Sequence, residues 1–308
     1  MIHCNSCILS IDAGGTSLKA ALVHTDSQAG GYPCLTRKTF FSVPVNSSGT
    51  KEDILTAYKT VVCKGAIMAA DKHLRICHVA LCTPGPFDYV KGCSLMKHKY
   101  QATYEIPLAP YLMEGLGYEV PCTFLHDSSA FLLGAAQIES IQKQKICGVT
   151  IGTGLGFACM IDGKIQETPS GGPSISIYAR PYMDGIAEDY VSKRGIMQRY
   201  HAKQKTSLLQ LTVAEIASKA REGDLTALET FADTGYHLGQ ILLPILRDYQ
   251  FETVVLGGAI SKSADLFLTQ LSGILSDTGA TIYPVSDIDL VPIVGAVQYV
   301  TYHNSNSL

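Results

Sequence analysis

A chain of 308 residues, 46% of them hydrophobic, is long enough to bury one large core or two medium ones. Its formal net charge of -3 provides no basic field for nucleic acid, and no apolar run reaches the roughly 18–20 residues of a membrane span. The N-terminal residues lack the basic start and long apolar core of a signal peptide. We therefore expect a cytoplasmic protein that acts on a small molecule, with neither nucleic acid nor a membrane as partner.

The first predicted element is a buried strand over residues 8–11 that ends at Asp12, and residues 20–23 form its partner across a hairpin. The residues that could form a phosphate loop here are Gly14, Gly15, Thr16 and Lys19. Glycines let the backbone approach a ligand and direct N–H groups at a phosphate, and Asp12 could hold Mg²⁺ through water. A plain glycine hairpin with solvated charges is the alternative, and the spacing is not that of a Walker A loop.

A polar connection over residues 25–31 leads to a third predicted strand over 40–45. A helix follows to about Asp71, with Ser48 or Thr50 as its N-cap. A short buried strand over 78–82 then ends at a rigid loop that contains Pro84, Gly85, Pro86 and Asp88. Repeated passes of strand and helix predict a layered α/β domain.

The next predicted strand ends in the polar residues His126 and Asp127 and leads into a helix over 130–141. Ligands of open α/β sheets bind beyond the carboxyl ends of strands, so both residues are candidates for a site. Asp127 can also be only a helix cap, and His126 only a structural histidine.

A second unit of strand, glycine turn and strand covers residues 146–161, and Asp162-Gly163 predicts a further hairpin. Its turn consists of Gly152, Thr153, Gly154, Leu155 and Gly156. Two such turns on opposite sides of a cleft would clamp a polyphosphate. A matched pair is a stronger signal than one glycine cluster.

The rest of the chain is predicted to be mostly helical. Helices are expected to open at 184–190 and to cover 211–222 and 225–249. A buried strand from 252 ends at Gly257 and Gly258, against which a flat ligand group could lie. A helix over 263–275, a strand over 281–283 and a terminal helix from 293 complete the order.

The ten cysteines are scattered, and most lie in or beside apolar stretches, where a free thiol packs as a small hydrophobe. Cys4 and Cys7 form the only close pair, and a zinc site would need a second one. We interpret the cysteines as structural, with a redox or metal role for this pair as the alternative.

The motifs Asp12-x-Gly-Gly-Thr-x-x-Lys19, His126-Asp127, Ile151-Gly-Thr-Gly-x-Gly156 and Leu256-Gly-Gly258 occur in this order. The set resembles the ROK family of sugar kinases and repressors, within the actin/hexokinase/Hsp70 superfamily. The resemblance implies a two-domain α/β fold of the actin-like ATPase (ribonuclease H-like) type with a cleft between the domains. The domains would be residues 1–124, joined by a terminal helix over about 291–308, and residues 125–290. No helix-turn-helix segment precedes Asp12, which favours the kinase branch.

The resemblance also implies a reaction: ATP-dependent phosphorylation of a hydroxyl on a hexose, an N-acetylhexosamine or a related sugar, with ATP and Mg²⁺ as cofactors, by a homodimer. Asp127 matches the catalytic general base, and Asp12 matches the aspartate associated with Mg²⁺. The nucleotide would bind at the two phosphate loops and the adenosine motif, which comprise Asp12, Gly14, Gly15, Thr16, Lys19, Gly152, Thr153, Gly154, Gly156, Gly257 and Gly258. The sugar would bind near Pro84, Gly85, Asp88, His98, His126, Asp127 and Glu188.

The chain departs from the family pattern on the sugar side. Residues 160–200 contain no Cys and no His, so we expect no structural zinc and the loss of a Glu and a His that normally reach the sugar. His126 and Ser129 stand where the family has asparagines. A non-catalytic sugar or nucleotide sensor on the same fold is therefore the main alternative, and a structural protein of actin type is a third class.

Overall fold

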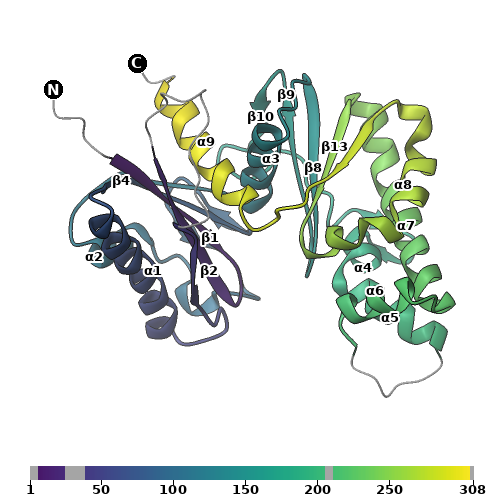
Figure 1. Cartoon of the computed structure of the whole chain (residues 1–308), viewed down its shortest axis with the longest axis horizontal. Coiled ribbons are helices and arrows are strands. Elements are labelled where there is room, and N and C mark those ends of the chain that lie inside the picture. Colours follow the sequence, from purple (N-terminus) through teal and green to yellow (C-terminus); the bar gives the residue numbers. More distant parts are fainter. Residues whose placement is uncertain (1–5, 25–38, 205–210, 306–308) are drawn as a thin grey trace. The chain divides into compact units, whose positions relative to one another are not determined.

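The computed structural model describes residues 6–24, 39–204 and 211–305 (Figure 1). The polar connection over 25–31, Cys4 and the first five residues of the segment 206–249, which the sequence predicts to be largely helical, lie outside these ranges. The chain divides into two compact units. Unit 1 spans residues 1–141, 167–173 and 289–308, and unit 2 spans residues 142–166 and 174–288.

Unit 1 contains a five-stranded sheet in the order β3-β2-β1-β4-β7. The bounds are β1 Ser6–Ala13, β2 Ser17–His24, β3 Phe41–Pro44, β4 Arg75–Thr83 and β7 Cys122–His126. The first three strands pair antiparallel, whereas β4 runs parallel to β1 and β7 runs parallel to β4. The carboxyl ends of β1, β4 and β7 therefore meet at one edge of the sheet.

Helices cover both faces of this sheet because its central strands are apolar on both sides. The helices are α1 Lys51–Asp71, α2 Ala109–Leu116, α3 Asp127–Ile138 and α9 Val291–Ser305. Leu9 and Ile11 of β1 pack in the core that includes α1 and α2, and Ile8 packs in the smaller core that includes α9. Thr50 and Asp53 form a capping box at the start of α1, so Thr50 and not Ser48 is the N-cap. Three short elements, β5 Phe87–Asp88, β6 Cys93–Ser94 and a 3₁₀ turn η2 Gln101–Thr103, lie between β4 and α2.

The division of the chain differs from the predicted boundary at residue 124. Residues 125–141 belong to unit 1, because β7 pairs with β4 and because α3 packs along α9. The terminal helix α9 also lies in unit 1. His126 and Asp127 therefore share a unit with Asp12.

Glycines let α3 and α9 approach each other closely. A Cβ atom on Gly295 would lie 1.7 Å from the carbonyl oxygen of Ala130, and one on Gly134 would lie 1.9 Å from that of Val291. We predict that Gly295→Ala lowers the free energy of unfolding by about 1–3 kcal/mol or more, because backbone stands where the methyl group must go. Chemical denaturation measures the change.

The matched control for that prediction is Gly273→Ala in α8 (Leu268–Leu275), where no atom lies within 4 Å of the added methyl group. Both substitutions gain helix propensity, which is worth up to about 1 kcal/mol. Only the alanine at position 295 would collide with backbone atoms. Equal unfolding free energies for the two variants would contradict the close packing of α3 on α9.

Unit 2 repeats the plan with the sheet order β10-β9-β8-β13-β14. The bounds are β8 Lys145–Ile151, β9 Leu155–Ile161, β10 Lys164–Ile165, β13 Thr253–Gly257 and β14 Thr281–Pro284. The hairpin of β8 and β9 is antiparallel, and β13 pairs parallel to β8 on its other side. Each sheet therefore contains a hairpin that is closed by one of the two predicted glycine turns.

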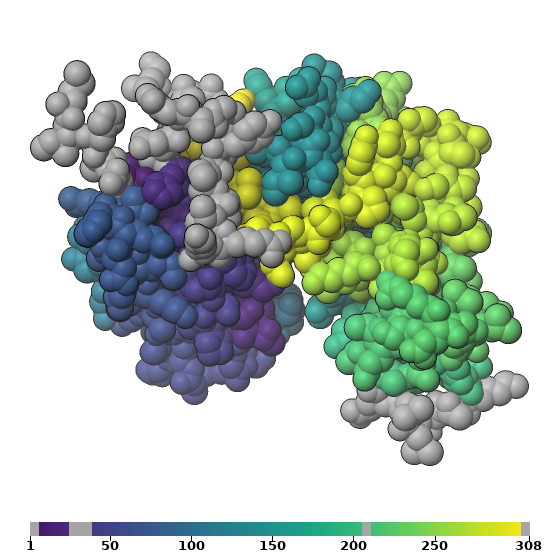
Figure 2. Space-filling view, viewed as in Figure 1, coloured from purple at the N-terminus to yellow at the C-terminus, as the bar shows by residue number. Residues whose placement is uncertain are grey.

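The helices of unit 2 are α4 Ala187–Val191, α5 Lys193–Gln204, α6 Val213–Arg221, α7 Leu225–Tyr249 and α8. A small hairpin of β11 Pro181–Tyr182 and β12 Gly185–Ile186 precedes α4, and 3₁₀ helices η3 Ala259–Leu266 and η4 Ser276–Thr278 flank α8. Helices α5 and α6 form, with part of α7, one continuous end of unit 2, drawn in green in Figure 2. No helix within the described ranges is long and apolar enough to cross a membrane.

Several elements differ from the sequence prediction. Helix α5 was not predicted, and the helix expected to open at 184–190 begins only at Ala187, after β12. Helix α2 was not predicted. The helix expected over 263–275 is a kinked 3₁₀ segment followed by α8. Helix α3 begins at Asp127 rather than at 130, because the side chain of His126 accepts from the N–H of Ser128 and caps the helix three residues earlier.

Candidate functional site

Two carboxylates lie at the carboxyl edge of the unit 1 sheet. Asp12 ends β1, Asp127 directly follows β7, and both side chains are half-buried. Burial, and then the negative charge of Asp127, raises the pKa of Asp12 to about 6. The thiol of Cys82 on β4 donates to Oδ1 of Asp12 at 3.6 Å. The negative charges of the two carboxylates repel each other, which raises the pKa of Asp12. A divalent cation at Asp12 would relieve this repulsion, so the charge of the pair suits Mg²⁺.

Asp127 is held in place by its two neighbours. Its Oδ1 accepts from the N–H of Ser128 at 2.7 Å and lies 2.9 Å from Nδ1 of His126. Burial alone would raise the pKa of Asp127, but the charge of His126 and the hydrogen bonds from His126 and Ser128 lower it below its usual range. The carboxylate is therefore ionised at neutral pH, as a proton acceptor must be. His126 is the N-cap of α3, so Asp127 is not merely its cap.

Hydrogen bonds to its carbonyl oxygens hold the glycine turn of unit 1 in place. The oxygens of Gly15 and Thr16 accept from Ser47 and Val45, both at 3.1 Å, and the hydroxyl of Tyr100 donates to the oxygen of Gly14. Thr16 stays exposed at the tip. This arrangement holds the turn in one shape, as a phosphate loop requires.

Two lysines lie near this turn, the predicted Lys19 and a second one, Lys99. The ammonium of Lys19 is bound to Asp289 at 2.6 Å. Lys99 was not predicted, yet a Cβ on Gly15 would lie 3.8 Å from its Cε. The only sequence signal was that Lys99 lies in the short basic stretch of residues 97–99.

The predicted sugar residues of unit 1 separate into two groups. Pro84 and Gly85 follow β4, and a Cβ on Gly85 would lie 3.5 Å from Nε2 of His126. Asp88 instead holds a turn, since its Oδ1 accepts from the N–H groups of Val90 and Lys91 at 3.2 and 2.9 Å. These backbone bonds, led by that of Lys91, lower the pKa of Asp88. His98 is exposed.

The glycine turn of unit 2 is built around Glu188. Its Oε2 accepts from the N–H of Leu155 at 2.9 Å, and a Cβ on Gly154 would lie 2.7 Å from the same oxygen. Glu188, predicted to contact the sugar, thus shapes the turn in which Gly152, Thr153, Gly154 and Gly156 lie. Gly257 pairs with Thr150 beside this turn, and Gly258 (φ 84°) lies so close that a Cβ would be 2.3 Å from the oxygen of Ile151.

A pocket of about 400 Å³ adjoins this turn in unit 2. Thr153 lines it together with one side of α5, namely Lys193, Arg194, Met197, Gln198 and His201. The N–H of Lys193 donates to the oxygen of Gly152 at 2.8 Å, which fixes the helix to the turn. Cationic groups around Met197 suit an anionic ligand that also has a flat apolar part. The sequence analysis missed these residues, although their helical spacing could have indicated a common face.

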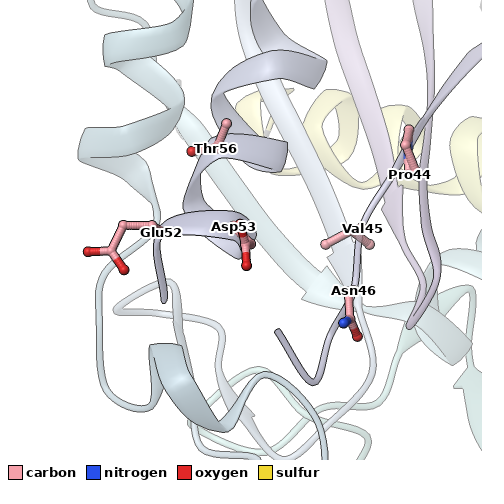
Figure 3. A pocket seen from close by; sticks show the side chains of 6 residues that line it. All are labelled: Pro44, Val45, Asn46, Glu52, Asp53 and Thr56. Atoms are coloured by element: carbon pink, nitrogen blue, oxygen red, sulfur yellow. The ribbon is translucent and has the colours of Figure 1, made fainter. Parts of the chain in front are cut away.

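A second pocket, of about 370 Å³, lies in unit 1 (Figure 3). Glu52, Asp53 and Thr56 line it from α1, and Pro44, Val45 and Asn46 line it from the end of β3 and the loop after it. Asp53 is engaged in the capping box, and Oδ1 of Asn46 accepts from the N–H of Ser48 at 3.1 Å. Its acidic lining disfavours phosphate, and it contains none of the predicted site residues.

Comparison with known proteins places the chain in a family. The family model described as "ROK family" matches residues 8–174 and 182–292. The chain belongs to the ROK family. Its mixed α/β architecture is that of ROK sugar kinases, which have an actin-like ATPase fold.

ROK relatives of both kinds match this chain. It is 25% identical over 214 residues to the DNA-binding transcriptional repressor Mlc of Escherichia coli (strain K12), covering 64% of this chain and 52% of that protein. It is 24% identical over 261 residues to an N-acetylmannosamine kinase of Shigella boydii serotype 18, covering 82% of each. The chain thus spans about half the length of the repressor and most of the kinase.

Solved ROK structures agree in fold. A ROK family glucokinase from Streptomyces griseus, in complex with glucose and AMPPNP, superposes with a TM-score of 0.76 at 18% identity, covering 95% of this chain and 98% of that one. Within the described ranges, no three His, Cys, Asp or Glu side chains are grouped to hold a metal ion. The loss of the family's zinc stays a prediction.

Proposed function

We propose that this protein catalyses ATP-dependent phosphorylation of a sugar hydroxyl, with Asp127 as general base. The observation that carries the proposal is the pair of Asp12 and Asp127 at the carboxyl edge of the unit 1 sheet. The pKa of Asp127 is lowered, whereas burial and the charge of Asp127 raise the pKa of Asp12. A hexose, an N-acetylhexosamine or a related sugar is the substrate class, as the ROK relatives suggest.

The chain's own residues have distinct tasks in this reaction. Asp127 accepts the proton of the attacking hydroxyl, while Ser128 and His126 fix its orientation. Asp12 would hold Mg²⁺ through water, and the bound ion would neutralise charge on the phosphates. The glycine turns bind phosphates through backbone N–H groups, and the pocket beside Thr153 takes another part of the nucleotide.

A panel of hexoses and N-acetylhexosamines with ATP and coupled ADP detection tests the proposal. Sugar-dependent ADP release from the wild type, lost in Asp127→Asn, is the expected result. Silence across the panel would sink the kinase assignment.

A non-catalytic sugar or nucleotide sensor is the second candidate. It is favoured by the match to the repressor Mlc and by the engagement of Lys19 and Asp88 in protein contacts. Sugars that raise the melting temperature of the protein without any ADP release would support it. The homodimer and the cytoplasmic location stay predictions.

The pocket on unit 2 gives a separate prediction. Lys193→Ala is expected to raise KM for ATP roughly tenfold with little change in KM for the sugar, since it removes a cation from the proposed nucleotide side. Lys164→Ala, which removes an exposed lysine from β10 of the same unit, serves as the charge-matched control. Equal KM values for ATP in both variants would argue against this pocket as part of the nucleotide site.

A further inference from the structure

The glycine turn of unit 1, residues 14–16, has free hydrogen-bond donors. All three of its carbonyl oxygens accept hydrogen bonds from the protein. The N–H of Gly14 also has a partner, the oxygen of Ser17 at 3.0 Å. The N–H groups of Gly15 and Thr16, in contrast, have no acceptor among the described residues. Two adjacent backbone donors with the neighbouring carbonyl groups engaged suit an anion and not a cation.

The side chain of Lys99 lies beside these donors. A Cβ on Gly15 would be 3.8 Å from Cε of Lys99 and 4.0 Å from its Cδ, so the end of the lysine stem lies against the glycine. Lys99 is half-buried, and its ammonium forms neither an ion pair nor a hydrogen bond with any other described residue. The turn therefore has an uncompensated positive charge next to its free N–H groups.

The backbone of Tyr100 fixes the position of Lys99. Tyr100 is buried, its N–H donates to the oxygen of Ser47 at 2.6 Å, and its hydroxyl donates to the oxygen of Gly14. Ser47 in turn donates to the oxygen of Gly15 at 3.1 Å. The φ of Tyr100 is 52°, a left-handed conformation that a bulky residue adopts only where its surroundings enforce it, as they do at ligand sites. These hydrogen bonds hold the residue before Tyr100 at the turn.

Lys19, the lysine of the sequence motif, already has a counter-ion. Its ammonium lies 2.6 Å from Oδ1 of Asp289. A phosphate that binds Lys19 must displace or share this carboxylate, whereas Lys99 has no ion pair to give up. An ammonium and backbone N–H groups together form the charge-assisted hydrogen bonds that phosphate oxygens accept.

We propose that Lys99 binds the terminal phosphate of the nucleotide together with the N–H groups of Gly15 and Thr16, in the phosphate-binding role predicted for Lys19. The identity of the ligand rests on the proposed kinase function. The anion site itself rests only on the free donors and the uncompensated ammonium.

Calorimetric titration of the full chain with AMPPNP and with ADP, each with Mg²⁺, tests the proposal, because ADP lacks the terminal phosphate. Lys99→Met keeps the length and the apolar stem of the side chain and removes its charge. We expect this variant to bind AMPPNP about 10–100-fold more weakly and to lose much less affinity for ADP. Lys97→Met, which removes an exposed lysine two residues earlier, is the matched control and should leave both affinities unchanged.

Two results would overturn the proposal. An unchanged affinity of Lys99→Met for AMPPNP would show that the ammonium binds no phosphate, and equal losses for AMPPNP and ADP would show that it does not bind the terminal one. Lys99→Gln provides the same test if Lys99→Met does not fold. Lys99→Arg, which keeps the charge, should recover part of the affinity.

A comparison of the two lysines separates the proposal from the motif prediction. Lys19→Met breaks the ion pair with Asp289 and should lower Tm, but it should weaken AMPPNP binding less than Lys99→Met does. A larger loss in Lys19→Met would assign the phosphate to Lys19 instead.

A nucleotide-free probe keeps the anion site testable if the proposed function fails. If the wild type binds no nucleotide, titration with inorganic tripolyphosphate replaces AMPPNP. Weaker binding by Lys99→Met than by Lys97→Met would then support the anion site. Equal affinities in these two variants, or no binding of tripolyphosphate by the wild type, would overturn it.

Discussion

Asp127→Asn is expected to lower kcat for sugar phosphorylation by about 10²–10⁴-fold and to leave nucleotide affinity unchanged. The amide keeps the shape of the side chain and can still accept from the N–H of Ser128, but it cannot take a proton from the sugar hydroxyl. Coupled ADP detection measures the rate, and calorimetry with a non-hydrolysable ATP analogue measures the affinity. Retained turnover would contradict the assignment of the base.

The charge-matched control for this substitution is Asp71→Asn, at the exposed end of α1 in the same unit. It should leave both kcat and affinity at the wild-type level. A loss of nucleotide binding in Asp127→Asn alone would place Asp127 on the nucleotide instead of the sugar.

The pH profile follows from the direction of the shift at Asp127. Because the folded pKa of Asp127 is lowered, its stabilising contribution is present above the ordinary aspartate pKa and is lost only as the pH falls through the lower, folded value. Asp127 therefore stays ionised throughout the range near neutrality. Any loss of activity near pH 6 should arise from Asp12, whose pKa is about 6, and not from the base.

The strands around the site were predictable because their chemistry is local. Apolar runs that end in Asp12, His126-Asp127 or a glycine turn identify both the strand and its functional end, and the structure places β1, β7 and β8 there. Parallel pairing of β1 and β7 with β4 then brings the two aspartates to one edge. Sequence order and periodicity suffice for this much.

Side-chain partners could not be predicted, because they depend on residues far apart in the chain. Lys19 meets Asp289 across 270 positions, and Glu167 meets Tyr299 across 132. Asp88 matches a sugar-site motif, yet its carboxylate holds a local turn that a motif cannot reveal. The α5 residues of the pocket beside Thr153 have no sequence signature except their common helical face. The proposed sugar side, where such contacts decide the role of a residue, was therefore the least predictable part.

Asp12→Asn is expected to make the protein more stable and less active at the same time. The pKa of Asp12 is raised from 3.8 to about 6 by burial and by the charge of Asp127. Because the pKa of Asp12 is higher in the folded protein, its contribution to folding stability is fully present below the ordinary aspartate pKa. This contribution is lost as the pH rises through about 6. At pH 8 the wild type thus holds an ionised carboxylate in an unfavourable place, which the neutral amide avoids.

The size of the stability gain can be bounded. A shift of this size corresponds to at most about 3 kcal/mol at pH 8, and solvent access to the half-buried side chain reduces it to about 1–2 kcal/mol. We expect a rise in Tm of about 2–6 °C over the wild type at pH 8, in EDTA and without nucleotide, that vanishes at pH 4. Asp71→Asn should show no such pH-dependent gain.

The same substitution removes the carboxylate that we propose for Mg²⁺. Turnover should fall in Asp12→Asn, and addition of Mg²⁺ and ATP should raise Tm for the wild type more than for the variant. A variant that is equally destabilised at pH 4 and pH 8 would show that Asp12 supports the fold by packing. A carboxylate that serves the chemistry and one that serves the fold thus differ in what their removal does. Removal of the first raises stability and lowers activity, because its charge repels a neighbouring charge, whereas removal of the second lowers stability.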